Sequence, residues 1–263
     1  GLFGEKGYGL SNAGEESSVQ SLSIEQIKSH HGRLVKPGNQ VLSIFGDIDI
    51  EQVKKELSNL WEDSSESSMI ELPQSPSETR VETLALSETC DKKQSVVVFG
   101  FPGTTFFDKE RHALDLLQET CSDLGSRLFM RIRDELGLAY YVGAQHMPGI
   151  VRGYFGFYAG TSPEHVEQVK EEFKIQINKI KSEGITQQEL DRSKAKMLGQ
   201  KQIARQDLGH LAMASALDEL YGLGFQHPLE EDAAIRAVSL EDVQKAAEKI
   251  FDLENSTVAV VGP

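Results

Sequence analysis

The sequence predicts an α+β domain, an antiparallel sheet with helices packed mainly on one face. Segments in which apolar residues recur every three or four positions alternate with short apolar segments of strand length. Two of these strands flank Pro148-Gly149, as in a hairpin, and a last strand over residues 257–262 follows a capped helix. The 263 residues are 39% hydrophobic and 26% charged, a globular composition that excludes disordered and collagen-like chains.

The first elements are expected before residue 62. A helix begins at the cap Ser23 and must end before Pro37. A short apolar strand, Val41–Phe45, follows, and residues 50–61 have the apolar spacing of an amphipathic helix. Residues 63–82 are polar, rich in serine and interrupted by proline, so we expect an exposed linker there.

The segment after the linker returns to alternating strands and helices. Asp108 can cap one helix. Ser126 can cap a short helix over residues 127–136, which Gly137 is placed to end. The strands expected around these helices cover residues 81–87, 95–101, 138–145 and 151–159.

The remaining chain is mostly helical. A long helix begins after the cap at Ser162-Pro163 and ends at Gly184. Thr186 and Glu189 form a capping box for the next helix, whose pattern continues with a break near Gln206. The helical pattern extends in this way to Gly222.

An internal repeat relates the two ends of the chain. Ser23–Gly46 aligns without a gap with Ser239–Gly262, at an offset of 216 residues, and each segment reads as a capped helix, a turn and an apolar strand. Two homologous halves would explain this agreement, and chance similarity of two such units is the alternative. With two halves, most of the first half would precede Gly1, in keeping with a chain that starts in a glycine-rich loop without Met.

The strand at residues 41–45 is apolar on both faces. Such a strand is expected to have neighbours on both sides in a sheet. Because an unpaired strand can pair with another chain, we predict self-association through this strand.

Charge and composition exclude several classes of partner. Lys and Arg number 27 against 41 Asp and Glu, so the net charge of -14 disfavours binding to nucleic acid or to an anionic membrane. No apolar run approaches the ~20 residues of a membrane span. The two cysteines, Cys90 and Cys121, are expected to be thiols. We therefore expect a soluble protein of the cytoplasm or the periplasm.

The histidines show no zinc-binding pattern. None of the seven belongs to a His-Glu-x-x-His or His-x-x-Glu-His motif, and the adjacent His30 and His31 point to different sides of a helix. The sequence also has no phosphate-binding glycine loop and no Gly-x-Ser-x-Gly. Acidic runs such as Glu230-Glu231-Asp232 are typical of solvated faces or helix starts. We expect no metal or cofactor site in this chain.

The most informative stretch is Gly125-Ser-Arg-Leu-Phe-Met-Arg-Ile-Arg-Asp-Glu-Leu-Gly-Leu-Ala-Tyr140. It resembles a segment of the pitrilysin/insulinase family of zinc peptidases, which includes the mitochondrial processing peptidases and carries an inverted His-x-x-Glu-His motif. Further segments follow in the order of the family, and the resemblance covers nearly the whole chain. These segments are residues 14–27, 40–49, 153–158, 184–190, 196–199 and 238–262.

The resemblance implies a clamshell of two homologous α+β halves, with zinc in the first half and the second closing over the peptide substrate. This chain would hold the tail of the first half at residues 1–62, the linker at 63–82 and the complete carboxy-terminal domain at 83–263. Zinc would be bound in the parent protein by residues that this chain lacks. Its partners would be a peptide and either the missing amino-terminal half or a homologous zinc-bearing subunit.

The resemblance also implies two site residues, Arg133 and Tyr140, which match the paired Arg and Tyr of the family's second half. A guanidinium and a phenol offer hydrogen-bond donors for a peptide carbonyl or for the oxyanion that develops during hydrolysis. The structural alternative is that Arg133 pairs with Asp134, Glu135 or another carboxylate, and that Tyr140 is a half-buried strand residue.

The expected function is therefore that of the zinc-less half of a zinc metalloendopeptidase, inactive by itself. One alternative is a non-catalytic scaffold homologue of the same fold. Another is a partner subunit that lends Arg133 and Tyr140 to a separate zinc-bearing chain. The upstream half discriminates between these functions, because only a single-chain peptidase would carry the zinc motif there.

Overall fold

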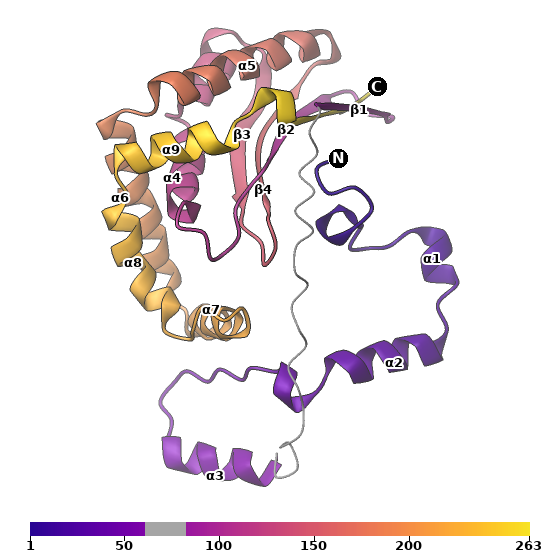
Figure 1. Cartoon of the computed structure of the whole chain (residues 1–263), viewed down its shortest axis with the longest axis vertical. Coiled ribbons are helices and arrows are strands. Elements are labelled where there is room, and N and C mark those ends of the chain that lie inside the picture. Colours follow the sequence, from indigo (N-terminus) through magenta and orange to yellow (C-terminus); the bar gives the residue numbers. More distant parts are fainter. Residues whose placement is uncertain (61–82) are drawn as a thin grey trace. The chain divides into compact units, whose positions relative to one another are not determined.

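The computed structural model describes residues 1–60 and 83–263 (Figure 1). The predicted linker at 63–82 lies outside the described residues. The chain divides into two compact units: the first takes Gly1–Leu10, Gln74–Gly199 and Ala233–Pro263, and the second takes Ser11–Pro73 and Gln200–Asp232.

One five-stranded sheet forms the first unit, with the strand order β1-β5-β2-β4-β3. Its strands are β1 (Leu84–Thr89), β2 (Ser95–Pro102), β3 (Ala139–Met147), β4 (Tyr154–Thr161) and β5 (Thr257–Gly262). All neighbours are antiparallel except β1 and β5. The terminal strand β5 inserts between β1 and β2, which run antiparallel to each other, so it must be parallel to one of them. The predicted α+β class is confirmed, with a mixed sheet in place of a purely antiparallel one.

Three helices cover one face of this sheet: α4 (Arg111–Ser122), α5 (Val166–Glu183) and α9 (Leu240–Ile250) (Figure 1). The strand residues that face them are large and apolar, as the alternation of each strand predicts. Neighbouring phenylalanine rings pack at centroid distances of 5.0–6.2 Å. These rings belong to Phe99, Phe101, Phe155, Phe157, Phe173 and Phe251, all buried.

The opposite face of the sheet carries tyrosines and glycines. The ring of Tyr141 on β3 lies over Gly160 of β4, and the ring of Tyr158 lies over Gly143. A side chain at either glycine would collide with the tyrosine above it, so the close approach requires glycine. Part of this face is also covered by the first ten residues, where the hydroxyl of Tyr8 accepts a hydrogen bond from the backbone N–H of Ile150 at 3.1 Å.

Most predicted helix ends are confirmed. Thr186 and Glu189 exchange hydrogen bonds at the start of α6 (Gln187–Ala204), and Asp207 caps α7 (Leu208–Leu220) through the N–H of His210. Gly184 ends α5 with a φ of 70°.

Two helix starts differ from the prediction. Asp108 does not cap α4, which begins at Arg111 after Glu110; the carboxylate of Asp108 instead accepts from the N–H of Thr105 in the preceding turn. The helix α8 (His227–Ala237) was not predicted, although Pro228 stands in its first turn, where proline is tolerated. No helix in the described part of the chain is long and apolar enough to cross a membrane.

The internal repeat has a structural counterpart. The helix α2 (Ile24–Leu34) and the 3-10 turn η2 (Pro37–Asn39) have the same lengths and spacing as α9 and the turn η5 (Leu253–Asn255), at the same offset of 216 residues. Both helices also begin with a capping box, at Ser23 and Ser239. The local sequence therefore encodes the same helix and turn twice.

The two copies differ after the turn. Residues 257–262 form β5, but the predicted strand Val41–Phe45 is wrong, because residues 41–45 form no strand. A strand persists only beside a hydrogen-bonded neighbour, and no described segment pairs with residues 41–45. The other described helices of the amino-terminal region are η1 (Gly7–Gly9), α1 (Glu16–Gln20) and α3 (Ile50–Leu60).

Candidate functional site

The helix that carries Arg133 has an unusual pitch. Ser126 accepts a hydrogen bond from the N–H of Phe129 at 3.1 Å, which confirms the predicted cap. Residues Phe129–Glu135 then form a π-helix, η3, in which the N–H of Leu136 reaches the carbonyl of Arg131 five residues back. Such π segments often occur at functional sites.

Arg133 lies near the end of η3 with its side chain exposed. Its guanidinium carbon is 4.8 Å from the centroid of the Phe129 ring, which is a cation–π contact. Among the described residues, Arg133 forms no ion pair. Glu135 instead binds Arg131 at 2.9 Å. The pairing of Arg133 with Glu135 that the sequence left open is therefore not observed.

Tyr140 lies in a bulge of β3. Ala139 pairs with Thr161 and Tyr141 with the adjacent Gly160, so Tyr140 is the extra residue between them. Its side chain is 57% exposed, and the described residues give its hydroxyl no hydrogen bond. The half-buried environment that the structural alternative supposed is therefore not observed.

Backbone hydrogen bonds join the end of η3 to the start of β3. The N–H of Gly137 donates to the carbonyl of Arg133 at 3.1 Å, and the N–H of Leu138 donates to Ile132 at 2.9 Å. Gly137 makes the reversal with a φ of 63°, which favours glycine. The exposed side chains of Arg133 and Tyr140 therefore emerge from the two sides of one short turn.

Sequence reasoning missed a buried polar network in the same unit. The imidazole Nδ1 of His146 is 2.7 Å from Asp115 Oδ1, and its Nε2 is 2.9 Å from Thr104 Oγ1. Because a carboxylate only accepts, Nδ1 carries the proton, and the Nε2 of a neutral imidazole accepts from Thr104. Burial alone would raise the pKa of Asp115, but hydrogen bonds from His112 and His146 lower it to about 2. Thr104 and His146 are buried and Asp115 is partly buried, which indicates a structural role.

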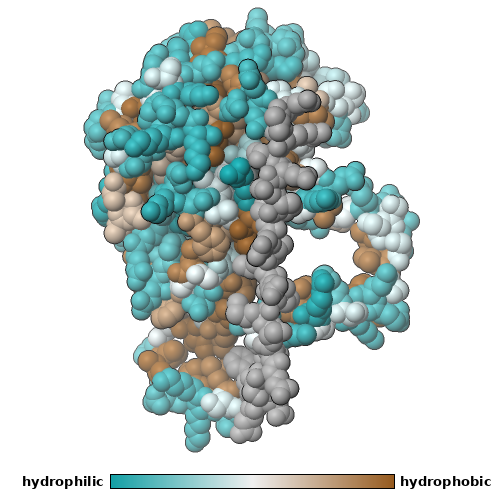
Figure 2. Space-filling view, viewed as in Figure 1, coloured by the Kyte–Doolittle hydropathy of each residue, from teal (hydrophilic) through white to brown (hydrophobic). Residues whose placement is uncertain are grey.

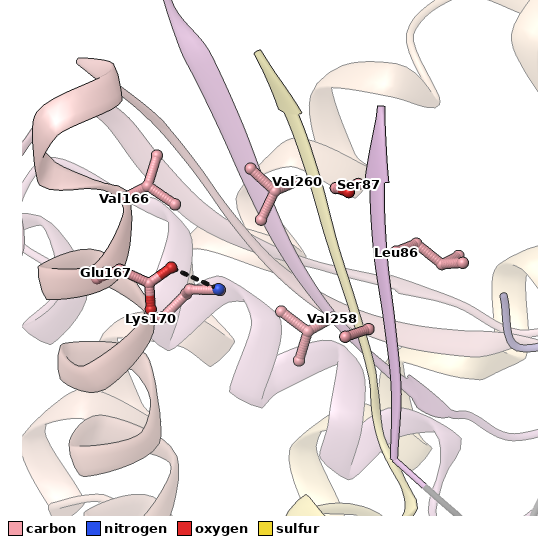
Figure 3. Close-up of a pocket in the computed structure, with 8 residues that line it drawn as sticks. Leu86, Ser87, Val166, Glu167, Lys170, Val258 and Val260 are labelled. Carbon is pink, nitrogen blue, oxygen red and sulfur yellow. Dashed lines mark hydrogen bonds and ion pairs between the residues drawn. The ribbon is translucent and has the colours of Figure 1, made fainter. Parts of the chain in front are cut away.

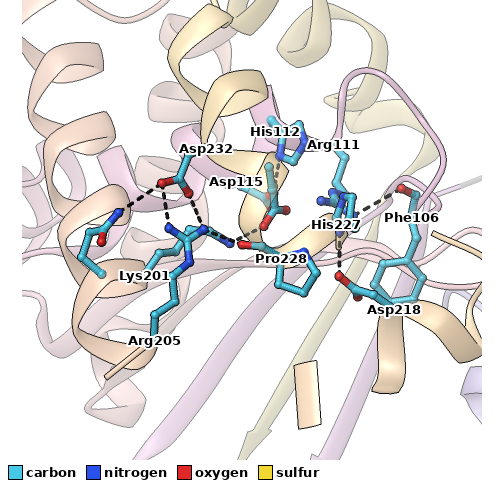
Figure 4. Close-up of polar contacts among 12 residues, drawn as sticks. Phe106, Arg111, His112, Asp115, Lys201, Arg205, Asp218, His227, Pro228 and Asp232 are labelled. Atoms are coloured by element: carbon cyan, nitrogen blue, oxygen red, sulfur yellow. Dashed lines mark hydrogen bonds and ion pairs between the residues drawn. The ribbon is translucent and has the colours of Figure 1, made fainter. Parts of the chain in front are cut away.

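A second polar network lies in the other unit (Figure 4). Arg205 binds both carboxylate oxygens of Asp232, at 2.6 and 2.8 Å, and also the carbonyl of Pro228. Lys201 pairs with Glu231. The acidic run at 230–232, expected to be a solvated face or a helix start, thus also fixes the start of α8 against the end of α6.

An apolar cavity of about 340 Å³ lies between α5 and the strands β1 and β5 (Figure 3). Val166 of α5 faces Val258 and Val260 of β5 across it. Its polar lining includes Glu167 and Lys170, which bind each other at 2.7 Å. The cavity contains neither Arg133 nor Tyr140.

The described residues do not fit a zinc site. They contain no group of three or more His, Cys, Asp or Glu side chains that could hold a metal ion. Both ring nitrogens of His146 are already engaged. The two cysteines are thiols, as expected, and burial raises the pKa of Cys121 to about 12, so its thiolate is inaccessible at neutral pH.

Comparison of the chain with known proteins identifies its family. A family model described as the peptidase M16 inactive domain matches residues 21–197. The chain belongs to the M16 peptidase family. The M16 inactive domain from Pseudomonas fluorescens has the same fold, with a TM-score of 0.88 and 19% identity over 100% of this chain and 62% of that one. The resemblance to zinc peptidases, stated from the motifs, is thereby confirmed.

Relatives of this M16 chain carry two kinds of name. An uncharacterized zinc protease of Rickettsia bellii is 25% identical over 264 residues, which cover 100% of this chain and 63% of the relative. A protein of Helicobacter pylori named non-peptidase homolog YmxG is 26% identical over 271 residues, covering 96% of this chain and 59% of that protein. The M16 chain spans about three fifths of the length of these relatives.

Proposed function

We propose that this M16 chain is the zinc-less carboxy-terminal half of a zinc metalloendopeptidase, in which it encloses a peptide substrate and supports its hydrolysis. The observation that carries the proposal is the exposed pair Arg133 and Tyr140 beside one turn, with no ion pair on Arg133 among the described residues. Within residues 1–60 and 83–263, no carboxylate pairs with this guanidinium and no group hydrogen-bonds this phenol. Both can therefore donate to a peptide carbonyl or to an oxyanion.

The zinc of the parent protein would be held by the amino-terminal half or by a homologous subunit. The lack of a fitting ligand set in the described residues agrees with this division of labour. In this proposal, residues 1–62 are the tail of the preceding half, 63–82 the linker and 83–263 the carboxy-terminal domain. The matching lengths of α2–η2 and α9–η5 favour two homologous halves.

The test is Tyr140→Phe in the intact protein with both halves, loaded with zinc and assayed on fluorescein-labelled casein. Removing a donor that acts on the developing oxyanion lowers kcat by about tenfold or more. Tyr141→Phe is the matched control, because its ring packs on Gly160 and Tyr158. We expect lower turnover in the first variant only, with equal melting temperatures. Unchanged turnover in Tyr140→Phe would remove Tyr140 from the mechanism.

A non-catalytic role is the second candidate, since one relative is named a non-peptidase homologue. In that role the same fold would serve as a scaffold or as the partner of a zinc-bearing chain. The two candidates differ in one measurement: the intact protein with zinc hydrolyses casein in the first and does not in the second. A partner subunit would restore hydrolysis when its zinc-bearing chain is added.

A further inference from the structure

Phe129 and Arg133 stand four residues apart in η3, a spacing that places their side chains on one side of a helix. The guanidinium carbon lies 4.8 Å from the centre of the ring. A guanidinium within about 6 Å of an aromatic face is attracted by the ring quadrupole. The contact therefore fixes the direction in which Arg133 leaves the helix.

Two carboxylates near η3 bind Arg131 instead of Arg133. Arg131 binds Glu135 at 2.9 Å and Glu172 of α5 at 3.1 Å. Through these two ion pairs, Arg131 links η3 to α5. Glu135 binds Arg131 and does not pair with Arg133. In the described part of the chain, the aromatic ring thus takes the place that a carboxylate would otherwise hold beside Arg133.

Phe129 is itself anchored. Its side chain is partly buried and packs against the hydrophobic core, and its N–H donates to the Ser126 hydroxyl at 3.1 Å. One side of the ring is therefore held by the protein interior while the guanidinium lies over its face. A flexible arginine side chain gains from this a preferred orientation that it would not have in water.

We propose that Phe129 is a positioning residue, which orients the Arg133 guanidinium toward the peptide. This inference rests on the function proposed for Arg133. Phe129 does not touch the substrate, and its effect passes through Arg133 alone. A charged side chain held in the geometry of the transition state needs no reorganisation when the oxyanion forms.

The experiment compares Phe129→Leu with Phe129→Tyr in the intact, zinc-loaded protein, with fluorescein-labelled casein as the probe. The cation–π contact corresponds to a factor of about two to five, so we expect Phe129→Leu to lower kcat by that factor with little change in KM. Phe129→Tyr keeps the aromatic face, so its kcat should equal that of the wild type. In an Arg133→Ala background, Phe129→Leu should have no further effect.

A second readout does not depend on activity. The Phe129 ring should shift the NMR signal of the Arg133 Nε–H, and this ring-current shift should vanish in Phe129→Leu and persist in Phe129→Tyr. Met130→Leu, a change of an exposed side chain in the same π-helix, is the control for disturbance of η3. The melting temperatures of all variants distinguish a loss of folding from a loss of the orientation of the Arg133 side chain.

The outcomes are distinguishable. Loss of the ring-current shift together with lower kcat in Phe129→Leu, and no further effect with Arg133→Ala, supports the inference. An additional loss in the Arg133→Ala background, or an absent ring-current shift in the wild type, overturns it. If Arg133→Ala leaves kcat unchanged, the function proposed for Arg133 fails, while the NMR comparison still decides whether Phe129 holds its side chain.

Discussion

At the scale of single residues, the Thr104–His146–Asp115 network joins the sheet to α4. Its members come from the turn after β2, from β3 and from α4, and the side chain of His146 is fully buried. Gln118 of α4 also accepts from the N–H of His146 at 2.6 Å. These contacts thus satisfy both ring nitrogens of the buried His146 and its backbone N–H.

This network predicts a pH dependence of stability. The pKa of Asp115 is lowered from 3.8 to about 2 in the folded chain, so its ionised form stabilises the fold above pH 4 and this contribution disappears as the pH falls toward 2. The shift corresponds to about 2 kcal/mol. We expect Asp115→Asn to lower the free energy of unfolding by that amount at pH 7 and by much less at pH 2, measured by urea denaturation.

The control for net charge is Asp134→Asn, which removes one exposed carboxylate from η3. It separates the change in charge from the loss of the network. An equal loss of stability in Asp115→Asn at pH 7 and at pH 2 would contradict the assigned role of the Asp115 carboxylate.

At the scale of elements, glycine ends helices where the chain needs a positive φ. Gly137 follows η3 with a φ of 63°, a conformation that costs about 1–2 kcal/mol for other residues. Gly199 lies inside α6, and a Cβ added there would meet nothing within 4 Å. Glycine therefore stabilises the turn at Gly137 but destabilises the helix α6 at Gly199.

We expect Gly137→Ala to lower the free energy of unfolding by about 1–2 kcal/mol. Gly199→Ala should raise it by about 0.5–1 kcal/mol, because alanine loses less backbone entropy in a helix. Chemical denaturation of both variants checks the pair. A stabilised Gly137→Ala would mean that the turn between η3 and β3 tolerates another conformation.

At the scale of the whole molecule, the two copies of the repeat differ in burial. Val243 and Ile250 of α9 are buried in the hydrophobic core. In contrast, Ile24 and Ile27 of α2 are exposed, as are Leu42 and Ile44 after the turn. Apolar side chains reach the surface at several places on the face drawn in Figure 2. The first copy of the repeat thus has the apolar pattern of a buried helix and strand. The described residues do not bury these side chains.

Self-association therefore remains a prediction for this chain, even though residues 41–45 form no strand in it. Residues 41–45 have exposed apolar side chains and pair with no strand that the structure describes, and both features favour contact with a second copy. Analytical ultracentrifugation should show dimers or larger species at high concentration, and Leu42→Asp should reduce them. Ile203→Asp, at an apolar side chain of α6 that is 69% exposed, is the matched control. A strict monomer, or equal effects of both variants, would contradict the prediction.

The sequence by itself determined most helices, their caps and the repeat. These features depend on residues a few positions apart, such as Ser239 with Asp242 or Thr186 with Glu189, so a linear pattern contains the whole interaction. The motif around Arg133 and Tyr140 likewise indicated the family before any geometry was known.

Only the tertiary structure decided the pairing of strands and the surroundings of the site residues. The parallel pair β1–β5 joins residues more than 160 positions apart, and His146 meets Asp115 across 31. The bulge at Tyr140 depends on the register with β4. The burial of α9 depends on its packing beside α4 and α5, which its own sequence does not contain. These contacts form between segments that are far apart in the sequence. Neither segment alone indicates its partner, because strand register and side-chain burial are set only when the sheet and the helices pack together.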